Sequence, residues 1–306
     1  MKSTRLFAYL TLILSGILCA DSCVISRVLS ADGTKSDITP QEIAQRIHMD
    51  GILEAPFYTP SVDGPSKRRM MVYLPADYYN SKESYPVIYL LHGARGNEIS
   101  WVDQGCMTEI VDSLVRNRLL PKCIFVLPNM NQYSTEEQGL HSSFKSPLRA
   151  FFDTDGAIET SFINDIVGFV DSHYRTIPDK QHRAIAGLSI GSLQAAYITA
   201  TSPDVFDYVG LFSPIFKSYI TGGKYSSYYD PIKIKENRKI QFSDEHCPKV
   251  YLMMIGTNDF YFNHAEYTHL DMNVKGYRHE FITTSGGHDW PYWIEYLKYF
   301  LSKCKF

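Results

Sequence analysis

The sequence of 306 residues is 44% hydrophobic and carries a formal net charge of −3. This length and apolar content are sufficient for a large core in one or two domains. The mild negative charge is not gathered into blocks, which argues against a nucleic-acid-binding surface, and the sequence contains no internal repeat or low-complexity tract.

The N-terminus has the pattern of a secretory signal peptide. Two basic residues precede an apolar run over residues 6–20, which is short for a membrane span but has the length of a signal-peptide core. We expect residues 1–22 to be removed and the chain to be secreted or periplasmic. Lipidation of Cys23 is the alternative, although Asp21 makes a poor lipobox. No later segment of the sequence is long and apolar enough to span a bilayer.

The six cysteines show no CxxC spacing, so the sequence predicts no metal site built from them. In an exported chain, a Cys106–Cys123 or a Cys247–Cys304 disulfide is an open possibility. Buried free thiols are the interpretation that we favour.

A short helix and three strands are predicted in the first third of the chain. Residues 36–50 indicate a helix, with Thr39 as its N-cap, Pro40 in its first turn and Glu42 completing a capping box. Residues 52–61 and 68–78 have the pattern of strands on either side of a turn. The continuous apolar run over residues 85–93 predicts a strand that is buried on both faces, as in a parallel sheet.

Helices and strands then alternate to the C-terminus. The predicted strands are residues 123–130, 182–187, 208–214, 249–259 and 278–286, and the predicted helices are residues 108–119, 161–174, 192–202, 261–276 and 290–304. This alternation predicts an α/β fold with a mostly parallel central sheet and helices on both faces. No Pro- or Gly-rich linker divides it, so we expect one domain over residues 23–306, with residues 23–51 as an N-terminal lead-in.

Two long segments fit this pattern poorly, namely residues 131–156 and 224–246. Both are polar or rich in tyrosine and lie beyond the C-terminal ends of predicted strands. Loops at that edge of a parallel sheet usually shape a ligand pocket.

A serine lies between two glycines where a predicted strand turns into a helix. Ser189 has Gly187 and Gly191 two residues before and after it. A sharp turn of this kind exposes a serine nucleophile, and glycines remove side chains that would clash in it. A tight turn that merely contains a hydroxyl is the alternative, but the order of strand, turn and helix favours a nucleophile.

A serine nucleophile needs a base and an orienting acid. In an α/β-hydrolase both follow the serine, the acid first and the histidine last. His288 is the histidine that follows the last predicted strand, in a Gly-rich loop, and Asp259 follows the strongest late strand. Asp289 is the alternative acid, although neighbouring side chains usually point apart. We predict a triad of Ser189, Asp259 and His288.

The oxyanion hole should combine the backbone N–H of the residue after the nucleophile with one from the loop after an early strand. Ile190 is the residue after Ser189, and Ala94 lies just past His92 and Gly93 in such a loop. We expect Ile190 and Ala94 to be the two donors, and His92 to pack beneath the loop as a structural residue.

Several of these motifs together resemble those of the "putative esterase" (esterase D-like) family of α/β-hydrolases. They are RRMMVYLPADY, YPVIYLLHGARGNEISW, AGLSIG, IGTNDF and GGHDWPYW, in the family's order from about Ile52 to the C-terminus. The family includes the feruloyl and acetylxylan esterases of carbohydrate esterase family 1. The resemblance implies the same triad and the same oxyanion donors. This chain departs from the family in having Ser192 where a further glycine is common, and in the segment 224–246.

The motifs and the resemblance together predict a secreted serine esterase that removes feruloyl or acetyl groups from a polysaccharide and needs no metal or organic cofactor. Trp101 and Trp290 are the predicted substrate-binding residues, and Trp293 is a further candidate for the pocket wall. Acyl transfer, hydrolysis of small or siderophore esters, and a non-catalytic binding role on the same fold are the alternatives.

Overall fold

The computed structural model describes residues 39–61, 67–94, 96–130, 161–215, 247–274 and 276–306. The two segments that fitted the alternating pattern poorly, 131–156 and 224–246, lie outside these residues, as does the predicted signal peptide. Among the described helices, none has both the length and the apolar character needed to cross a membrane.

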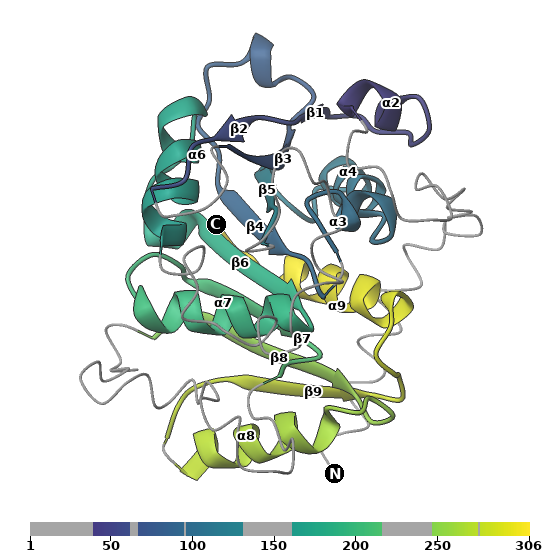
Figure 1. Ribbon diagram of the computed structural model, residues 1–306, viewed down its shortest axis with the longest axis vertical. Coiled ribbons are helices and arrows are strands. Elements are labelled where there is room, and N and C mark those ends of the chain that lie inside the picture. Colours follow the sequence, from purple (N-terminus) through teal and green to yellow (C-terminus); the bar gives the residue numbers. More distant parts are fainter. Residues whose placement is uncertain (1–38, 62–66, 95, 131–160, 216–246, 275) are drawn as a thin grey trace.

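A sheet of nine strands forms the centre of the described part of the molecule (Figure 1). The strands are β1 (Ile52–Glu54), β2 (Phe57–Tyr58), β3 (Arg68–Leu74), β4 (Val87–Leu91), β5 (Ile124–Pro128), β6 (Arg183–Leu188), β7 (Tyr208–Phe212), β8 (Val250–Gly256) and β9 (Glu280–Thr284). Their order is β1-β3-β5-β4-β6-β7-β8-β9, and β2 pairs with β3. The strands β5, β4, β6, β7, β8 and β9 are parallel, whereas β1, β2 and β3 join at one side through antiparallel pairs. The predicted, mostly parallel sheet is therefore confirmed.

Helices cover both faces of this sheet. They are α2 (Pro40–Ala44), α3 (Ser100–Asp103), α4 (Met107–Arg116), α6 (Gly168–His173), α7 (Ile190–Thr201), α8 (Phe262–Val274) and α9 (Trp290–Lys303), with short turns η1 (Tyr78–Asn80), η4 (Ile163–Val167) and η5 (Lys180–His182). One core cluster joins residues of α6, α7 and α8 to one face. The other joins residues of α2, α3, α4 and α9 to the opposite face. This is an α/β architecture with helices on both faces of a mostly parallel sheet, as the alternating pattern predicted.

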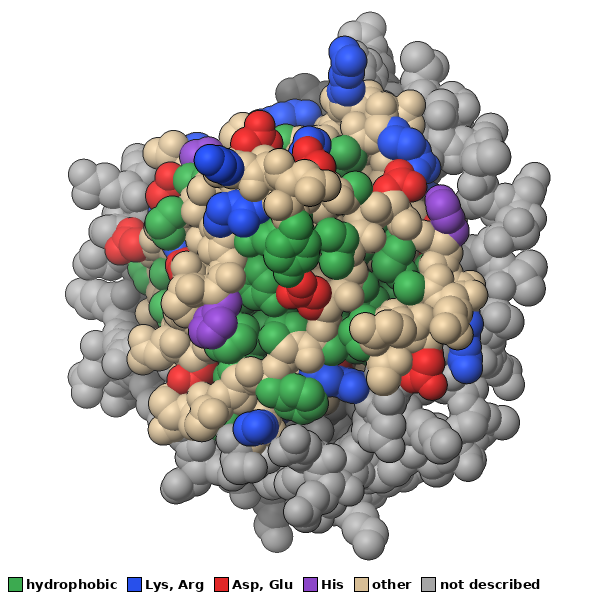
Figure 2. Space-filling view, turned by 90° about the horizontal axis from the view of Figure 1, so that it is seen from above, with side chains coloured by type: hydrophobic (Ala, Val, Ile, Leu, Met, Phe, Trp, Pro, Cys, Tyr) green, Lys and Arg blue, Asp and Glu red, His purple; other side chains and the backbone are tan. Residues whose placement is uncertain are grey.

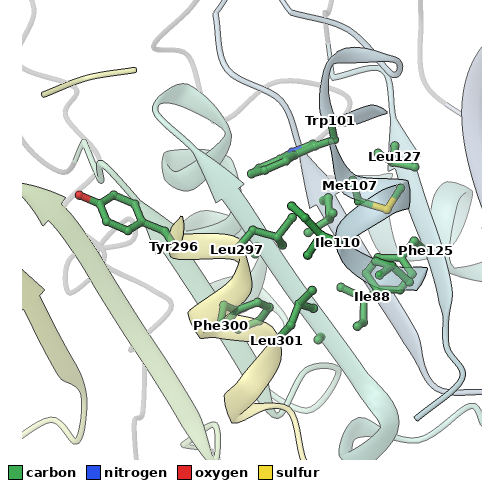
Figure 3. Packing of buried hydrophobic residues seen from close by; sticks show 14 of the residues in the cluster. Ile88, Trp101, Met107, Ile110, Phe125, Leu127, Tyr296, Leu297, Phe300 and Leu301 are labelled. Carbon is green, nitrogen blue, oxygen red and sulfur yellow. The ribbon is translucent and has the colours of Figure 1, made fainter. Parts of the chain in front are cut away.

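The second core cluster shows how the C-terminal helix is held on the sheet. In Figure 3, Leu297 and Leu301 of α9 lie on the side of the helix that faces Ile110 of α4 and Ile88 of β4, and Phe300 packs edge-to-face against Phe212 of β7. All three α9 side chains are at most 1% exposed. Burial of a large apolar side chain stabilises a fold by about 1.5–3 kcal/mol, so α9 is held firmly on the sheet.

The first helix follows the sequence prediction closely. The Thr39 hydroxyl accepts a hydrogen bond from the Glu42 amide at 3.2 Å, and the Glu42 carboxylate accepts one from the Thr39 amide at 2.7 Å. This capping box satisfies two N–H groups that the helix itself leaves unpaired. Figure 2 views the end of the molecule that carries α2, β1 and β2, and acidic and basic side chains are interspersed on the described part of this face.

The cysteines differ from both disulfide pairs considered from the sequence. The favoured interpretation, buried free thiols, is confirmed for Cys123, Cys247 and Cys304 and is wrong for Cys106, which is disulfide-bonded. Neither a Cys106–Cys123 nor a Cys247–Cys304 bridge is formed. Burial raises the pKa of Cys123 and that of Cys304 well above the ordinary value, which keeps both thiols protonated and unreactive.

Candidate active site

Ser189 lies at the corner between β6 and α7, in a backbone conformation that is unusual for a serine. Its φ is 53° and its ψ is −118°. A non-glycine residue at positive φ costs on the order of 1–3 kcal/mol, so the surrounding structure must hold it there. The Ser189 amide donates to the Phe212 carbonyl at 2.9 Å, and this bond ties the corner to β7.

The two flanking glycines are required by close backbone contacts. A Cβ on Gly187 would lie 2.2 Å from the Gly191 carbonyl oxygen, and a Cβ on Gly191 would lie 2.4 Å from the His92 carbonyl oxygen. Because these neighbours are backbone atoms, no side-chain rotation could relieve the overlap. The glycines let β6, α7 and the end of β4 meet at this corner, as the sequence motif predicted.

Ser189, His288 and Asp259 form a continuous chain of hydrogen bonds. The His288 Nε2 atom lies 2.9 Å from the Ser189 Oγ atom, and the His288 Nδ1 atom lies 2.8 Å from Asp259 Oδ2. The three residues follow β6, β9 and β8, which are parallel strands whose carboxyl ends share one edge of the sheet. The structure therefore brings together the three residues that the sequence order predicted.

The Asp259 carboxylate is buried but well supplied with donors. Its Oδ1 atom accepts the Tyr261 amide at 2.9 Å, and the Ser213 hydroxyl also donates to this carboxylate. Burial by itself would raise the pKa of Asp259. The hydrogen bonds from His288, the Tyr261 amide and Ser213 outweigh burial and lower the pKa of Asp259 below its ordinary value. Asp259 is therefore ionised and able to stabilise a protonated imidazole.

Asp289, the alternative acid, occupies a different place. It is exposed and is the N-cap residue of α9. The atom that orients His288 Nδ1 is a carboxylate oxygen of Asp259, and the geometry therefore favours Asp259 over Asp289.

Two backbone N–H groups beside Ser189 are available to a ligand. Ile190 is the first residue of α7, so its N–H has no acceptor within the helix. Between described residues, the Ala94 N–H donates no backbone hydrogen bond. Ala94 lines the same pocket as Ser189. These are the two donors that the sequence predicted for an oxyanion hole.

His92 fixes the start of the loop that carries Ala94. Its Nε2 atom accepts the Met130 amide at 2.9 Å, so its proton lies on Nδ1, which donates to the Gly93 carbonyl at 2.8 Å. Burial lowers the pKa of His92 to about 4. A neutral, 2% exposed imidazole with both nitrogens paired is a structural residue, as predicted.

Glu98 fixes the other end of this loop. Its carboxylate accepts Arg69 Nε of β3 at 2.6 Å and Asn129 Nδ2, just past β5, at 2.8 Å. Glu98 is 2% exposed, so both hydrogen bonds lie out of water and are stronger than exposed ones would be. The loop with Ala94 is thus tied to the strand ends on both sides.

The hydrogen-bonded triad opens into a pocket of about 400 Å³. The described lining residues come from the loop after β4, from α3 and its C-terminal end, from the serine corner, from the two loops that carry Asp259 and His288, and from the start of α9. They are Gly93, Ala94, Gly96, Ser100, Gln104, Leu188, Ser189, Phe260, Tyr261, His288, Trp290 and Trp293. This volume lies within the range of small-molecule sites, and most of its large side chains are aromatic.

The predicted role of Trp101 in substrate contact is wrong, since Trp101 lies behind the wall of this pocket. Trp101 is 1% exposed, and its indole N–H donates to the Leu91 carbonyl at 3.1 Å. Its ring packs edge-to-face against Trp290 at a centroid distance of 5.2 Å. Trp290 itself is half-buried and lines the pocket, as predicted, so Trp101 acts by supporting Trp290.

Among the residues of this site that sequence reasoning missed, three lie beside the triad. Ser213 touches the Asp259 carboxylate, and Phe260 and Tyr261 line the pocket. Phe260 and Tyr261 directly follow the predicted acid, and this position was the available signal. Ser213 stands at the end of β7 with a φ of 50°, and a polar residue after an apolar strand was the only hint. Within the described residues, no group of three or more His, Cys, Asp or Glu side chains could hold a metal ion.

Ser192, the departure from the family glycine, fits its place. Its hydroxyl donates to the Ser189 carbonyl at 2.5 Å, so the side chain adds a hydrogen bond to the first turn of α7 without displacing the corner.

Known proteins share sequence similarity with this chain. The family model described as "Putative esterase" matches residues 61–302. An endo-1,4-beta-xylanase/feruloyl esterase of Xylanibacter ruminicola is 32% identical over 175 residues, which are 56% of this chain and 21% of that protein. The chain thus spans about a fifth of the length of this curated relative.

Solved structures share the fold over most of the chain. A ferulic acid esterase superposes with a TM-score of 0.68 and 24% identity, covering 84% of this chain and 98% of that one. A CE1 ferulic acid esterase from Anaeromyces mucronatus, in complex with ferulic acid, superposes with a TM-score of 0.62 and 21% identity, covering 83% and 90% of the two chains.

Proposed function

Because the chain belongs to the "Putative esterase" family, we propose that it is a serine carboxylic-ester hydrolase with Ser189 as the nucleophile, His288 as the base and Asp259 as the orienting acid. One observation carries this proposal. It is the unbroken chain of hydrogen bonds from Ser189 Oγ through both nitrogens of His288 to the Asp259 carboxylate. A structural serine would not need a histidine and a buried carboxylate in this arrangement.

Acylation begins when Ser189 Oγ attacks the ester carbonyl carbon and His288 Nε2 takes the hydroxyl proton. The imidazole becomes positively charged, and the ionised Asp259, 2.8 Å from Nδ1, stabilises that charge. The carbonyl oxygen becomes an oxyanion, which the N–H groups of Ala94 and Ile190 would bind. In hydrolases of known mechanism, each donor of this kind is worth about 3–4 kcal/mol in the transition state.

Release of the alcohol and of the acyl group uses the same residues. His288 returns its proton to the ester oxygen as the bond to the acyl carbon breaks, and the alcohol leaves. Water then attacks the acyl-serine while His288 accepts a proton from it. The second tetrahedral intermediate collapses to the free acid as His288 returns that proton to Ser189 Oγ, which restores both residues. Apart from water, these steps use groups of Ser189, His288 and Ala94, which line the pocket. The other two groups are the Asp259 carboxylate, which is hydrogen-bonded to His288, and the N–H of Ile190, the residue after Ser189.

We propose that the substrate is a feruloyl or acetyl ester of a polysaccharide. Three matched relatives carry feruloyl or ferulic acid esterase in their names, and one structure holds ferulic acid. The aromatic lining of this pocket, with Trp290 and Trp293 on the α9 side, suits a planar aromatic acyl group.

The test is a panel of esters with wild type and two variants. The esters are nitrophenyl acetate, methyl ferulate and acetylated xylan, which distinguish hydrolysis of an acetyl group from hydrolysis of a feruloyl group. We expect wild type to hydrolyse at least one of them and Ser189→Ala to lose more than about 10³-fold in kcat. Ser172→Ala, an exposed serine on α6, is the matched control and should keep full activity. Wild type that is inert on every ester, or a fully active Ser189→Ala variant, would contradict the proposal.

A further inference from the structure

Phe260 is a large apolar side chain that the pocket leaves open to water. It directly follows Asp259 and is 69% exposed, although it lines the pocket with Ser189 and His288. A single exposed aromatic is not unusual by itself. Its position beside the proposed catalytic base is what requires an explanation.

The Phe260 ring is held in place by its neighbours. Its centroid lies 4.4 Å from that of His288, with the two rings inclined at 42°, and 4.5 Å from that of Tyr261. The backbone on both sides is fixed, because the Tyr261 amide donates to the Asp259 carboxylate and the Phe262 amide donates to the Asp259 carbonyl, each at 2.9 Å. The ring is therefore a preorganised surface, and a ligand would lose little entropy in ordering it.

The chemistry of His288 determines which part of the substrate meets this surface. After acylation, His288 Nε2 must protonate the oxygen of the departing alcohol, so that alcohol has to lie against His288. Phe260 covers the His288 ring at the open side of the pocket. The more enclosed wall, made by Trp290 and by the 7% exposed Trp293, is left for the acyl group.

An exposed ring suits an alcohol that is apolar on one face only. A sugar ring has a face of C–H groups and a rim of hydroxyls. Its C–H face can stack on an aromatic ring while the hydroxyls stay in water. A wholly apolar alcohol would gain more from an enclosed wall than from a ring that remains 69% exposed.

We propose that Phe260 is the leaving-group subsite of this enzyme and stacks on the sugar ring whose hydroxyl carries the acyl group. This inference rests on the proposed function, since it takes His288 as the acid that protonates the leaving alcohol. It goes further by assigning the alcohol part of the substrate to a named side chain.

The test compares two esters that share an acyl group and differ in the alcohol. The acyl group is feruloyl or acetyl, whichever wild type hydrolyses, and the alcohols are methanol and arabinose or xylose. For Phe260→Ala, we expect kcat/KM for the sugar ester relative to the methyl ester to fall about tenfold, which corresponds to about 1.4 kcal/mol. The fall should come from a higher KM. Phe260→Trp, which keeps a stacking surface, should retain most of the wild-type ratio.

Phe57→Ala is the matched control, because Phe57 is also an exposed phenylalanine, 46% exposed, on the edge strand β2. Its ratio should equal that of wild type. An unchanged ratio in Phe260→Ala would overturn the sugar subsite while leaving the proposed function intact. If that unchanged ratio comes with an equal loss of kcat/KM on both esters, Phe260 acts instead on the acyl group or on the placement of His288. A wild type that hydrolyses neither ester would overturn the proposed function itself, and this inference with it.

Discussion

The indole N–H of Trp293 donates a hydrogen bond to the Ser213 hydroxyl at 2.9 Å. That hydroxyl in turn donates to the Asp259 carboxylate. A tryptophan on α9 thus helps to place the orienting acid at the end of β8 through a serine at the end of β7. Ser213 is fully buried and its amide donates to the Met254 carbonyl at 2.7 Å, so the serine itself has little freedom to move.

Replacing Ser213 by alanine should slow the reaction without removing substrate binding. Loss of one hydrogen bond to a buried carboxylate costs about 1.5–3 kcal/mol, so we expect kcat to fall about tenfold or more, with little change in KM. The pKa of Asp259 should rise because a donor to its ionised form is lost. The pH–rate profile should therefore lose activity at a higher pH on its acid side than wild type does. An unchanged acid side would show that Ser213 acts only in packing.

A double variant that combines Ser213→Ala with Trp293→Phe tests whether Trp293 acts on Asp259 through Ser213. If Trp293 acts on Asp259 through Ser213, the effects of Ser213→Ala and Trp293→Phe on kcat should be clearly less than additive. Additive effects on kcat would show that Trp293 and Ser213 act independently of each other.

The identity of the orienting acid can be tested with a matched pair of asparagine variants. Asp259→Asn keeps the shape of the side chain but removes the charge that stabilises the imidazolium, and it can favour the wrong histidine tautomer. We expect kcat to fall by about 10³–10⁴-fold, as in other triads. Asp289→Asn, one residue after His288 and exposed, should change kcat by less than about threefold. The reverse result would assign the acid to Asp289.

Glu98 should act on the rate through the loop that carries Ala94. Glu98→Ala removes the anchor on Arg69 and Asn129, so we expect kcat to fall about 10–100-fold while KM changes much less. Glu98→Gln keeps the shape and should lose less. Because the oxyanion donor is affected, the affinity for a trifluoromethyl ketone that forms a tetrahedral adduct should fall in parallel with kcat. A normal affinity for that ketone in a slow Glu98→Ala variant would contradict this role.

His92 should make the stability of the fold depend on pH. Its pKa is lowered from 6.5 to about 4 in the folded state, so the folded state favours the neutral imidazole. The resulting stabilisation is complete above about pH 6.5 and is lost as the pH falls toward 4, and it is on the order of 3 kcal/mol. Urea unfolding of wild type at pH 7, 5.5 and 4 should show this decline. In His92→Gln, which does not titrate, this part of the decline should be absent, and an equal decline in both proteins would contradict the account.

The sequence was most informative where a local pattern fixes the backbone. The corner at Ser189 could be predicted from residues only two positions away, because a side chain on Gly187 or Gly191 would overlap nearby backbone atoms. Asp259 and His288 were found by their order after predicted strands, and parallel strands necessarily bring such ends to one edge. The alternation of strands and helices is likewise a local pattern, so the α/β fold with helices on both faces of the sheet could be predicted.

Features that depend on the spatial order of the strands could not be predicted in this way. Ser213 reaches Asp259 because β7 lies between β6 and β8, and no spacing in the sequence states that order. Trp101 was predicted to contact substrate as one of three tryptophans that were candidates for the pocket wall, but its indole is buried against Leu91 and Trp290. Burial of an aromatic side chain is decided by packing between distant elements, which a single sequence does not contain.

The central claim is that Ser189 is the residue that forms the covalent acyl intermediate. Its most direct test is to treat the protein with a fluorophosphonate, which reacts with an activated serine, and to locate the adduct by peptide mass spectrometry. We expect one adduct, on the peptide that contains Ser189, together with loss of esterase activity, and no adduct in Ser189→Ala or after unfolding. An adduct on a different serine, or an active enzyme that remains unlabelled, would contradict the account.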